Sequence, residues 1–201
     1  MKKTISTLLF LFVLVCTFGQ VGFYKSYTDF EENNLTPMDE FVEVKNAGNA
    51  FNIWFMKGGK KVKVLSEDVW GFRNKNELYR LAVVNGTDVP VRVLYSGDGE
   101  NTMCLYVPYQ SVVKNENGKP IIDWNKQVMA YGMVFNWCFL SKNLSSGITY
   151  CGVGSSGYVD DFRDNNPQFK AYFDCTGKQY KDSQLLVDCY GKTFPTGTPH
   201  F

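Results

Sequence analysis

Histidine is almost missing from this chain of 201 residues, because the only copy is His200, the penultimate residue. A Ser-His-Asp triad, a Cys-His pair or a multi-histidine metal site therefore cannot be built in the body of the fold. The sequence also has no CxxC pair, no phosphate-binding glycine loop and no dinucleotide-binding fingerprint. These gaps argue against most enzyme classes and against a cofactor, and we expect His200 to lie in a disordered tail.

A basic excess is missing as well. The 21 basic and 20 acidic side chains become 19 and 20 if Lys2 and Lys3 are removed with a leader, so the charges nearly balance. Proteins that bind nucleic acid usually carry a basic patch or stripe. The one local cluster, Lys57–Lys63, is interrupted by two glycines, so we interpret it as a solvated strand face and expect no nucleic-acid partner.

The first 19 residues have the pattern of an export signal. Lys2 and Lys3 precede the apolar run Leu8–Val15, and small residues follow it. The run is shorter than the roughly 20 residues that a membrane span needs. We therefore expect a mature chain, residues 20–201, that has no transmembrane span and is secreted, periplasmic or part of the cell envelope. Lipidation at Cys16 is the alternative.

Five cysteines remain in the mature chain, and an exported protein can keep disulfides. The spacing suits two local bonds, Cys138 with Cys151 and Cys175 with Cys189. Cys104 would be left over; it lies in a strand pattern without a neighbouring group that lowers the pKa of its thiol, so we expect it to be buried and inert. The connectivity stays open, because five cysteines can pair in many ways and can also be small buried hydrophobes.

Composition and periodicity predict a mainly β fold. Aromatic residues make up 16% of the chain, and short runs of Val, Phe and Tyr are bounded by turn residues. Between residues 51 and 107 this pattern predicts an antiparallel meander. We interpret the apolar run Val128–Leu140 as one central strand that pairs with Ile148–Val153. The expected architecture is a single β-rich domain over residues 20–201, an antiparallel β-sandwich or open barrel.

About three short helices complete this prediction. The capping-box spacing of Thr28 and Glu31 predicts one over Asp29–Asn33. The tail, residues 167–191, carries signals for two more, a proline at its start and Ser183 as an N-cap. We expect these two helices to give the C-terminal end an α+β character and to cover one end or edge of the sheet.

Two segments, GFYKSYTDF and EDVWGFRNKNELYRL, resemble the signatures of small exported proteins of Bacteroidetes. The likeness covers residues 22–84 and implies export and a β-rich domain, with no activity attached to it. It is carried by Gly22, Tyr24, Ser26, Asp29 and Phe30, and by Trp70, Gly71, Phe72, Leu78 and Tyr79.

Aromatic side chains are the first candidates for a binding surface, because their rings stack on apolar faces, including those of sugars. Trp70, Phe72 and Tyr79 surround the turn of the most regular stretch, Lys60–Val84. A packing corner of the sheet is the plainer interpretation of this turn. The tryptophans as a group are candidates for stacking on a glycan if they are exposed, namely Trp54, Trp70, Trp124 and Trp137.

Carboxylates are the remaining candidates. Asp160, Asp161 and Asp164 are candidate metal ligands, since their oxygens suit Ca²⁺, although their spacing fits no known calcium loop and acids just before a helix also suit its dipole. Asp98 and Glu100 belong to a turn, whereas a pair for glycoside hydrolysis needs positions that the fold fixes.

These observations favour an exported, non-catalytic envelope or binding module of unknown ligand, with a glycan or an envelope protein as the candidate partner. Two alternatives stay open. One is a barrel-type carrier of a small apolar ligand, suggested by the aromatic strands. The other is a carbohydrate-active enzyme that uses Asp or Glu residues.

Overall fold

The structure is a computed structural model of the chain. It describes residues 19–48, 50–97, 102–111, 113–116, 119–123, 128–130, 133–135, 137–152 and 155–200. Cys16 with the rest of residues 1–18, the turn acids Asp98 and Glu100, and Trp124 lie outside the described residues. No helix within the described ranges is long and apolar enough to cross a membrane.

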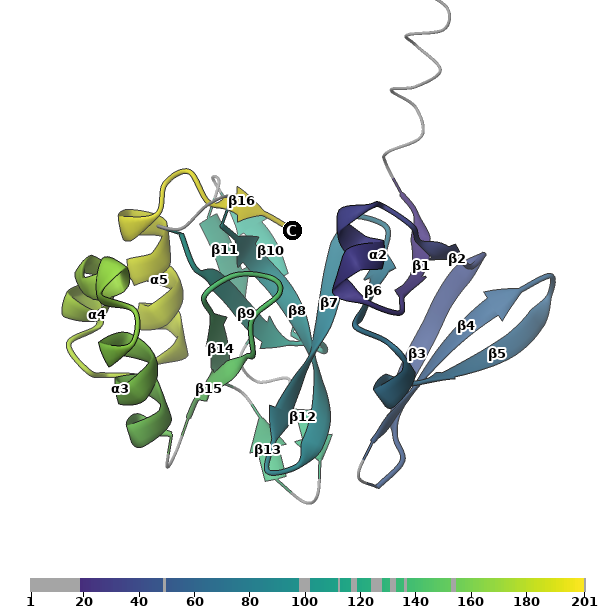
Figure 1. Cartoon of the computed structure of the whole chain (residues 1–201), viewed down its shortest axis with the longest axis horizontal. Coiled ribbons are helices and arrows are strands. Elements are labelled where there is room, and N and C mark those ends of the chain that lie inside the picture. Colours follow the sequence, from purple (N-terminus) through teal and green to yellow (C-terminus); the bar gives the residue numbers. More distant parts are fainter. Residues whose placement is uncertain are drawn as a thin grey trace, which may run out of the picture.

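One antiparallel sheet forms the centre of the fold (Figure 1). Its strands lie in the order β15, β14, β9, β8, β7, β6, β1, β2, and β16 pairs with β8 beside this path. The sheet stays open, with β15 and β2 at its two ends, so the predicted antiparallel β fold is confirmed as an open arrangement and not a closed barrel. The strands are β1 (Val21–Tyr24), β2 (Thr36–Pro37), β6 (Gly71–Asn74), β7 (Glu77–Val84), β8 (Thr87–Ser96), β9 (Cys104–Pro108), β14 (Cys138–Ser141), β15 (Thr149–Cys151) and β16 (Thr198–Pro199).

A second, three-stranded sheet packs against β1, β6 and β7. The Phe55 ring lies between the two sheets, 6.1 Å from the Phe23 centroid and 6.3 Å from that of Phe72. These contacts give the N-terminal part of the chain its sandwich-like character, because the apolar faces of both sheets are buried against each other. The sheet consists of β3 (Glu40–Asn46), β4 (Phe51–Lys57) and β5 (Lys60–Leu65), in that order. Two hairpins form separate two-stranded sheets that are not hydrogen-bonded to either of these, β10 (Val113–Glu116) with β11 (Lys119–Ile122) and β12 (Val128–Ala130) with β13 (Met133–Phe135).

The prediction of one central strand over Val128–Leu140 is wrong. The run is divided into the β12–β13 hairpin and the separate strand β14. The predicted partner is right, because β14 pairs with β15 and places Cys138 opposite Cys151. An apolar run shows that a segment is buried, but it does not show where the chain reverses direction.

Four α-helices occur in the described residues, one more than predicted: α2 (Tyr27–Glu31), α3 (Ser156–Asp164), α4 (Lys170–Thr176) and α5 (Ser183–Thr193). Short 3-10 turns lie at η2 (Ser66–Asp68) and η3 (Pro167–Phe169). The unpredicted helix is α3, in which Val159 is the one fully buried residue and Phe162 packs partly buried against the same core, so its apolar face is narrow. Helix α2 begins earlier than expected because Ser26 and Asp29, not Thr28 and Glu31, form the capping box.

Helices α3 to α5 cover the part of the main sheet formed by β8, β9, β14 and β15 (Figure 1). Phe169, Tyr172 and Phe173 are buried there, as their spacing predicts. Helix α5 is capped by Asp182, whose carboxylate accepts from the N–H of Leu185, and not by Ser183.

The expectation that His200 is disordered is also wrong. Its N–H donates to the carbonyl of Leu94 at 3.1 Å, and its ring Nε2 lies 2.7 Å from the Ser96 hydroxyl. The short strand β16 immediately before it pairs with the end of β8. Such a long-range pairing leaves no local signal in the sequence.

Candidate binding site beside the disulfide

Trp70, Phe72 and Tyr79 do not form one surface. Phe72 and Tyr79 stack with their centroids 4.6 Å apart and their planes 2° apart, and both are buried in the core. Trp70 packs instead on Tyr27 and Phe30, at centroid distances of 5.5 and 4.8 Å, and is half-buried. Of the three predicted residues, only Trp70 has a ring with substantial exposure.

The exposure of Trp70 is limited further by Arg80. The guanidinium carbon lies 4.7 Å from the ring centroid, and Nη1 donates to the carbonyl of Ser146 at 3.2 Å. Arg80 is 7% exposed, so the cation sits over the indole in a largely water-free position. These contacts support the packing-corner interpretation of Lys60–Val84.

The three candidate metal ligands do not come together as a site. They are Asp160, Asp161 and Asp164, and their carboxylates either contact other protein groups or lie apart. Arg163 binds Asp160 at 2.7 Å and Asp164 at 2.8 Å, and the Arg163 guanidinium holds the pKa of the Asp164 carboxyl below its usual range. All three acids lie within α3 and not before a helix, so the helix-dipole interpretation is wrong. Within the described residues, no group of three or more His, Cys, Asp or Glu residues is arranged to hold a metal ion.

One predicted disulfide is present and the other is not. Cys175 and Cys189 are bonded and join α4 to α5. Cys138 and Cys151, although opposite each other, are free and buried, as is Cys104. The Cys138 thiol instead donates to the carbonyl of Ser183 at 3.5 Å. Burial raises the pKa of all three thiols, so they stay protonated and unreactive at neutral pH.

A cavity of about 470 Å³ opens at the loop between α4 and α5. We call it the loop cavity. Five of its seven lining residues belong to this loop, and the other two lie near the start of α3. The lining residues are Gly152, Ser156, Lys178, Gln179, Tyr180, Lys181 and Asp182.

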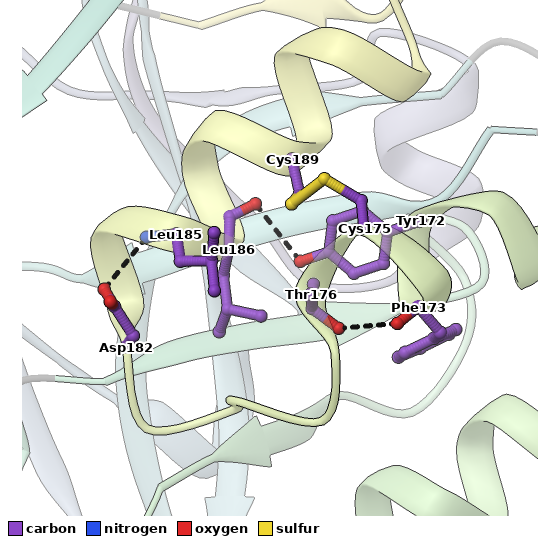
Figure 2. The surroundings of a disulfide bond; sticks show 8 residues. All are labelled: Tyr172, Phe173, Cys175, Thr176, Asp182, Leu185, Leu186 and Cys189. Carbon is purple, nitrogen blue, oxygen red and sulfur yellow. Dashed lines mark hydrogen bonds between the residues drawn. A yellow bond between two sulfur atoms is a disulfide. The ribbon is translucent and has the colours of Figure 1, made fainter.

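The loop is fixed at both ends (Figure 2). The disulfide holds the two helices that flank it, and Gly177 ends α4 with a φ of 54°, a left-handed conformation that favours glycine. Asp182 caps α5 by accepting from Leu185 at 3.0 Å. Between these ends, Tyr180 is 5% exposed, and its hydroxyl donates to Asp160 at 3.2 Å. The backbone of the loop is therefore held in one shape before any ligand arrives.

Lys178 and Lys181 give the loop cavity its charge. Both side chains are exposed, and neither forms an ion pair within 4 Å with any other described residue. The one acid of the lining, Asp182, accepts a hydrogen bond from the first turn of α5. By formal charge the lining holds two lysines and one aspartate, a net charge of +1.

Three aromatic rings lie next to the loop cavity. Trp137 stacks on Tyr150 at 6.0 Å and 25°, and Tyr150 contacts Tyr158 of α3 at 5.9 Å. We call these three residues the aromatic stack. Tyr158 is 62% exposed, the most exposed aromatic residue of the described chain.

Gly152 connects the aromatic stack to the loop cavity. It lines the cavity, and a Cβ atom added to it would collide with the Trp137 ring. Only glycine lets the indole lie directly on this backbone. The stack and the cavity thus meet at Gly152.

The sequence did not identify Tyr158, Lys178 or Lys181 as site residues. A signal for the lysines was present, because the predicted disulfide brackets the polar segment between the two tail helices. Tyr158 was hidden because α3 itself was not predicted.

No family model, no curated protein and no solved structure matches this chain. Function is therefore inferred from the residues of the site.

Proposed function

We propose that the mature chain is an exported, non-catalytic module that binds a saccharide on the aromatic stack. The observation that carries the proposal is the exposed Tyr158 ring, which is 62% accessible and packs against Tyr150, which in turn stacks on Trp137. A ring held in this way offers a rigid apolar face and a polar hydroxyl, and it loses little side-chain entropy on binding. The apolar C–H face of a sugar fits such a surface.

Two observations support export. The sequence begins with the pattern of an export signal. The Cys175–Cys189 disulfide suits an oxidising compartment, since disulfides persist outside the cytosol.

The groups around the loop cavity support binding more than catalysis. Burial raises the pKa of Tyr180, so its hydroxyl stays protonated and cannot accept a proton as a general base. The Asp182 carboxylate is held as the cap of α5.

The two alternative functions, a carbohydrate-active enzyme and a carrier of an apolar ligand, have less support. An enzyme that uses Asp160 or Asp164 would first have to break their ion pairs with Arg163. The loop cavity exposes more apolar than polar surface, as a carrier of an apolar ligand requires, but its lining also includes three charged residues, Lys178, Lys181 and Asp182.

The test is a titration of the secreted, oxidised mature chain with a panel of neutral and acidic oligosaccharides, followed by calorimetry. We expect saturable binding that weakens at least tenfold in Tyr158→Ala. Val83→Ala is the matched control, because Val83 is 63% exposed on β7 and lies outside the aromatic stack and the loop cavity. Lack of binding by every saccharide, or hydrolysis of one of them, would overturn the proposal.

A further inference from the structure

We infer that the saccharide is acidic and that its anionic group, a carboxylate or a sulfate, enters the loop cavity between Lys178 and Lys181. This inference rests on the proposed function, since it names the ligand class of the same site. It adds a second subsite to the aromatic stack, on the other side of Gly152.

The first reason for an acidic ligand is the charge of the residues that line the cavity. Lys178 and Lys181 lie three positions apart in one loop, and both side chains reach the same cavity. The neighbouring acids Asp160 and Asp164 share one cation, Arg163. An anion in the cavity would meet two lysines and one aspartate, Asp182. Neither lysine forms an ion pair within 4 Å with an acid among the described residues.

The second reason is the size of the cavity and the fixed backbone of the loop that lines it. Its volume of about 470 Å³ lies within the range of about 300–1,000 Å³ that is typical of small-ligand sites. The buried Tyr180 lies between the two lysines in sequence, and its hydroxyl bonds to Asp160. The lysines thus project from a fixed backbone, so an anion does not have to order the loop when it binds.

The third reason is the position of the aromatic stack relative to the cavity. Gly152 and Ser156 line the cavity, while Tyr150 and Tyr158 of the same segment belong to the stack. A chain of sugars with one ring on Tyr158 would have to extend past Ser156 to place the charged group of a neighbouring ring in the cavity. Stacking would supply contact with any sugar, and the lysines would select the acidic ones.

The discriminating experiment compares ligands that differ only in charge. The oxidised mature chain is titrated with a galacturonic acid trisaccharide, its methyl ester, a sulfated trisaccharide and a neutral trisaccharide. We expect at least one acidic ligand to bind at least tenfold more tightly than the methyl ester and the neutral sugar. Its affinity should fall as salt is added, because the contact is electrostatic. The comparison of the uronic acid with the sulfated sugar identifies which anionic group the cavity prefers.

Lysine variants test whether the preference for an acidic ligand arises in the loop cavity. Lys178→Gln with Lys181→Gln should remove the preference for the acidic ligand over the neutral sugar. Both lysines are exposed, so folding should be unaffected. Lys63→Gln is the control, because Lys63 is an exposed lysine of β5 in the other sheet.

Two results would count against the inference in different ways. If all four ligands bind equally and binding still depends on Tyr158, the inference fails and the proposed function stands. If no ligand binds, both fail. An acidic preference that survives the double lysine variant would also overturn the inference, because the anion would then be held elsewhere.

Discussion

The Arg80 guanidinium lies 4.7 Å from the centre of the Trp70 ring and donates a hydrogen bond to the carbonyl of Ser146. The hydrogen bond of Arg80 joins β7 to the connection between β14 and β15, two segments that are far apart in the sequence. The most regular stretch of the chain, Lys60–Val84, therefore contributes its tryptophan to the packing of the main sheet. The exposed aromatic surface lies elsewhere, at Tyr158.

Replacement of Trp70 tests this division directly. Trp70→Ala should lower the free energy of unfolding by about 3 kcal/mol, because it removes a large packed ring, and should leave saccharide binding unchanged. Urea unfolding followed by circular dichroism measures the change. A variant that keeps its stability and loses the ligand would show that the corner is the binding site.

The cation–π contact itself can be isolated by a double-mutant cycle between Trp70 and Arg80. We expect a coupling of about 1–2 kcal/mol, because Arg80 is almost fully buried. Trp54 and Lys61 provide the matched exposed pair, with the ammonium 5.4 Å from the ring and the Lys61 side chain 47% exposed. Their coupling should be about 0.5 kcal/mol, and equal couplings for the two pairs would contradict the account.

Removal of the disulfide should affect both stability and binding. The bonded cysteines are 14 residues apart, and a loop of that length predicts a loss of about 3 kcal/mol in the free energy of unfolding. Cys175→Ser with Cys189→Ser should also weaken binding of the acidic saccharide, since the loop that carries the lysines would be less ordered. Unfolding curves and titrations of the variant and of the oxidised chain provide the comparison. Unchanged affinity would mean that the loop does not need the bond for its shape.

The three buried thiols predict a dependence of stability on alkaline pH. Burial raises the pKa of Cys104, Cys138 and Cys151, so the folded protein keeps protons that the unfolded thiols release above about pH 8.5. Their contribution to stability is fully present below that pH and is lost as pH rises toward the raised pKa values. The expected slope is about 1.4 kcal/mol per pH unit for each thiol.

Urea unfolding at a series of pH values measures this slope, and alkylation of the unfolded, unreduced chain counts the thiols. Three modified cysteines are expected in the mature chain. One modified cysteine and a correspondingly shallow slope would show that Cys138 and Cys151 are bonded after all.

Gly152 is the position where a single methyl group should disturb the site. Gly152→Ala places a Cβ against the Trp137 ring, so it should shift tryptophan fluorescence and reduce saccharide affinity. Gly157→Ala is the control, since a Cβ there meets nothing within 4 Å and alanine favours the helix by about 0.5–1 kcal/mol. Similar effects of the two changes would contradict the role given to Gly152.

Local patterns in the sequence predicted much of the fold. The strands between Phe51 and Val107, the buried face of Phe169 and Tyr172, and the Cys175–Cys189 bond were all predicted from residue spacing. The capping-box pattern occurs twice at overlapping positions, as Ser26 with Asp29 and as Thr28 with Glu31. The structure is needed to show which of the two pairs caps α2.

The remaining features depend on contacts between distant segments. Only Val159 and the partly buried Phe162 of α3 pack on the core, so the periodic signal of that helix is short. The pairing of β16 with β8 orders His200, and the segment from Tyr150 to Tyr158 meets the α4–α5 loop only after folding. The candidate site was missed for the same reason, because its aromatic and basic residues come from separate elements.

The most direct test of the account is a map of amide chemical shifts as an acidic trisaccharide is added to the oxidised mature chain. The account predicts changes confined to the α4–α5 loop, around Lys178 and Lys181, and to the segment from Tyr150 to Tyr158. Changes centred on Trp70 and Tyr27, or no changes at saturating ligand, would contradict it.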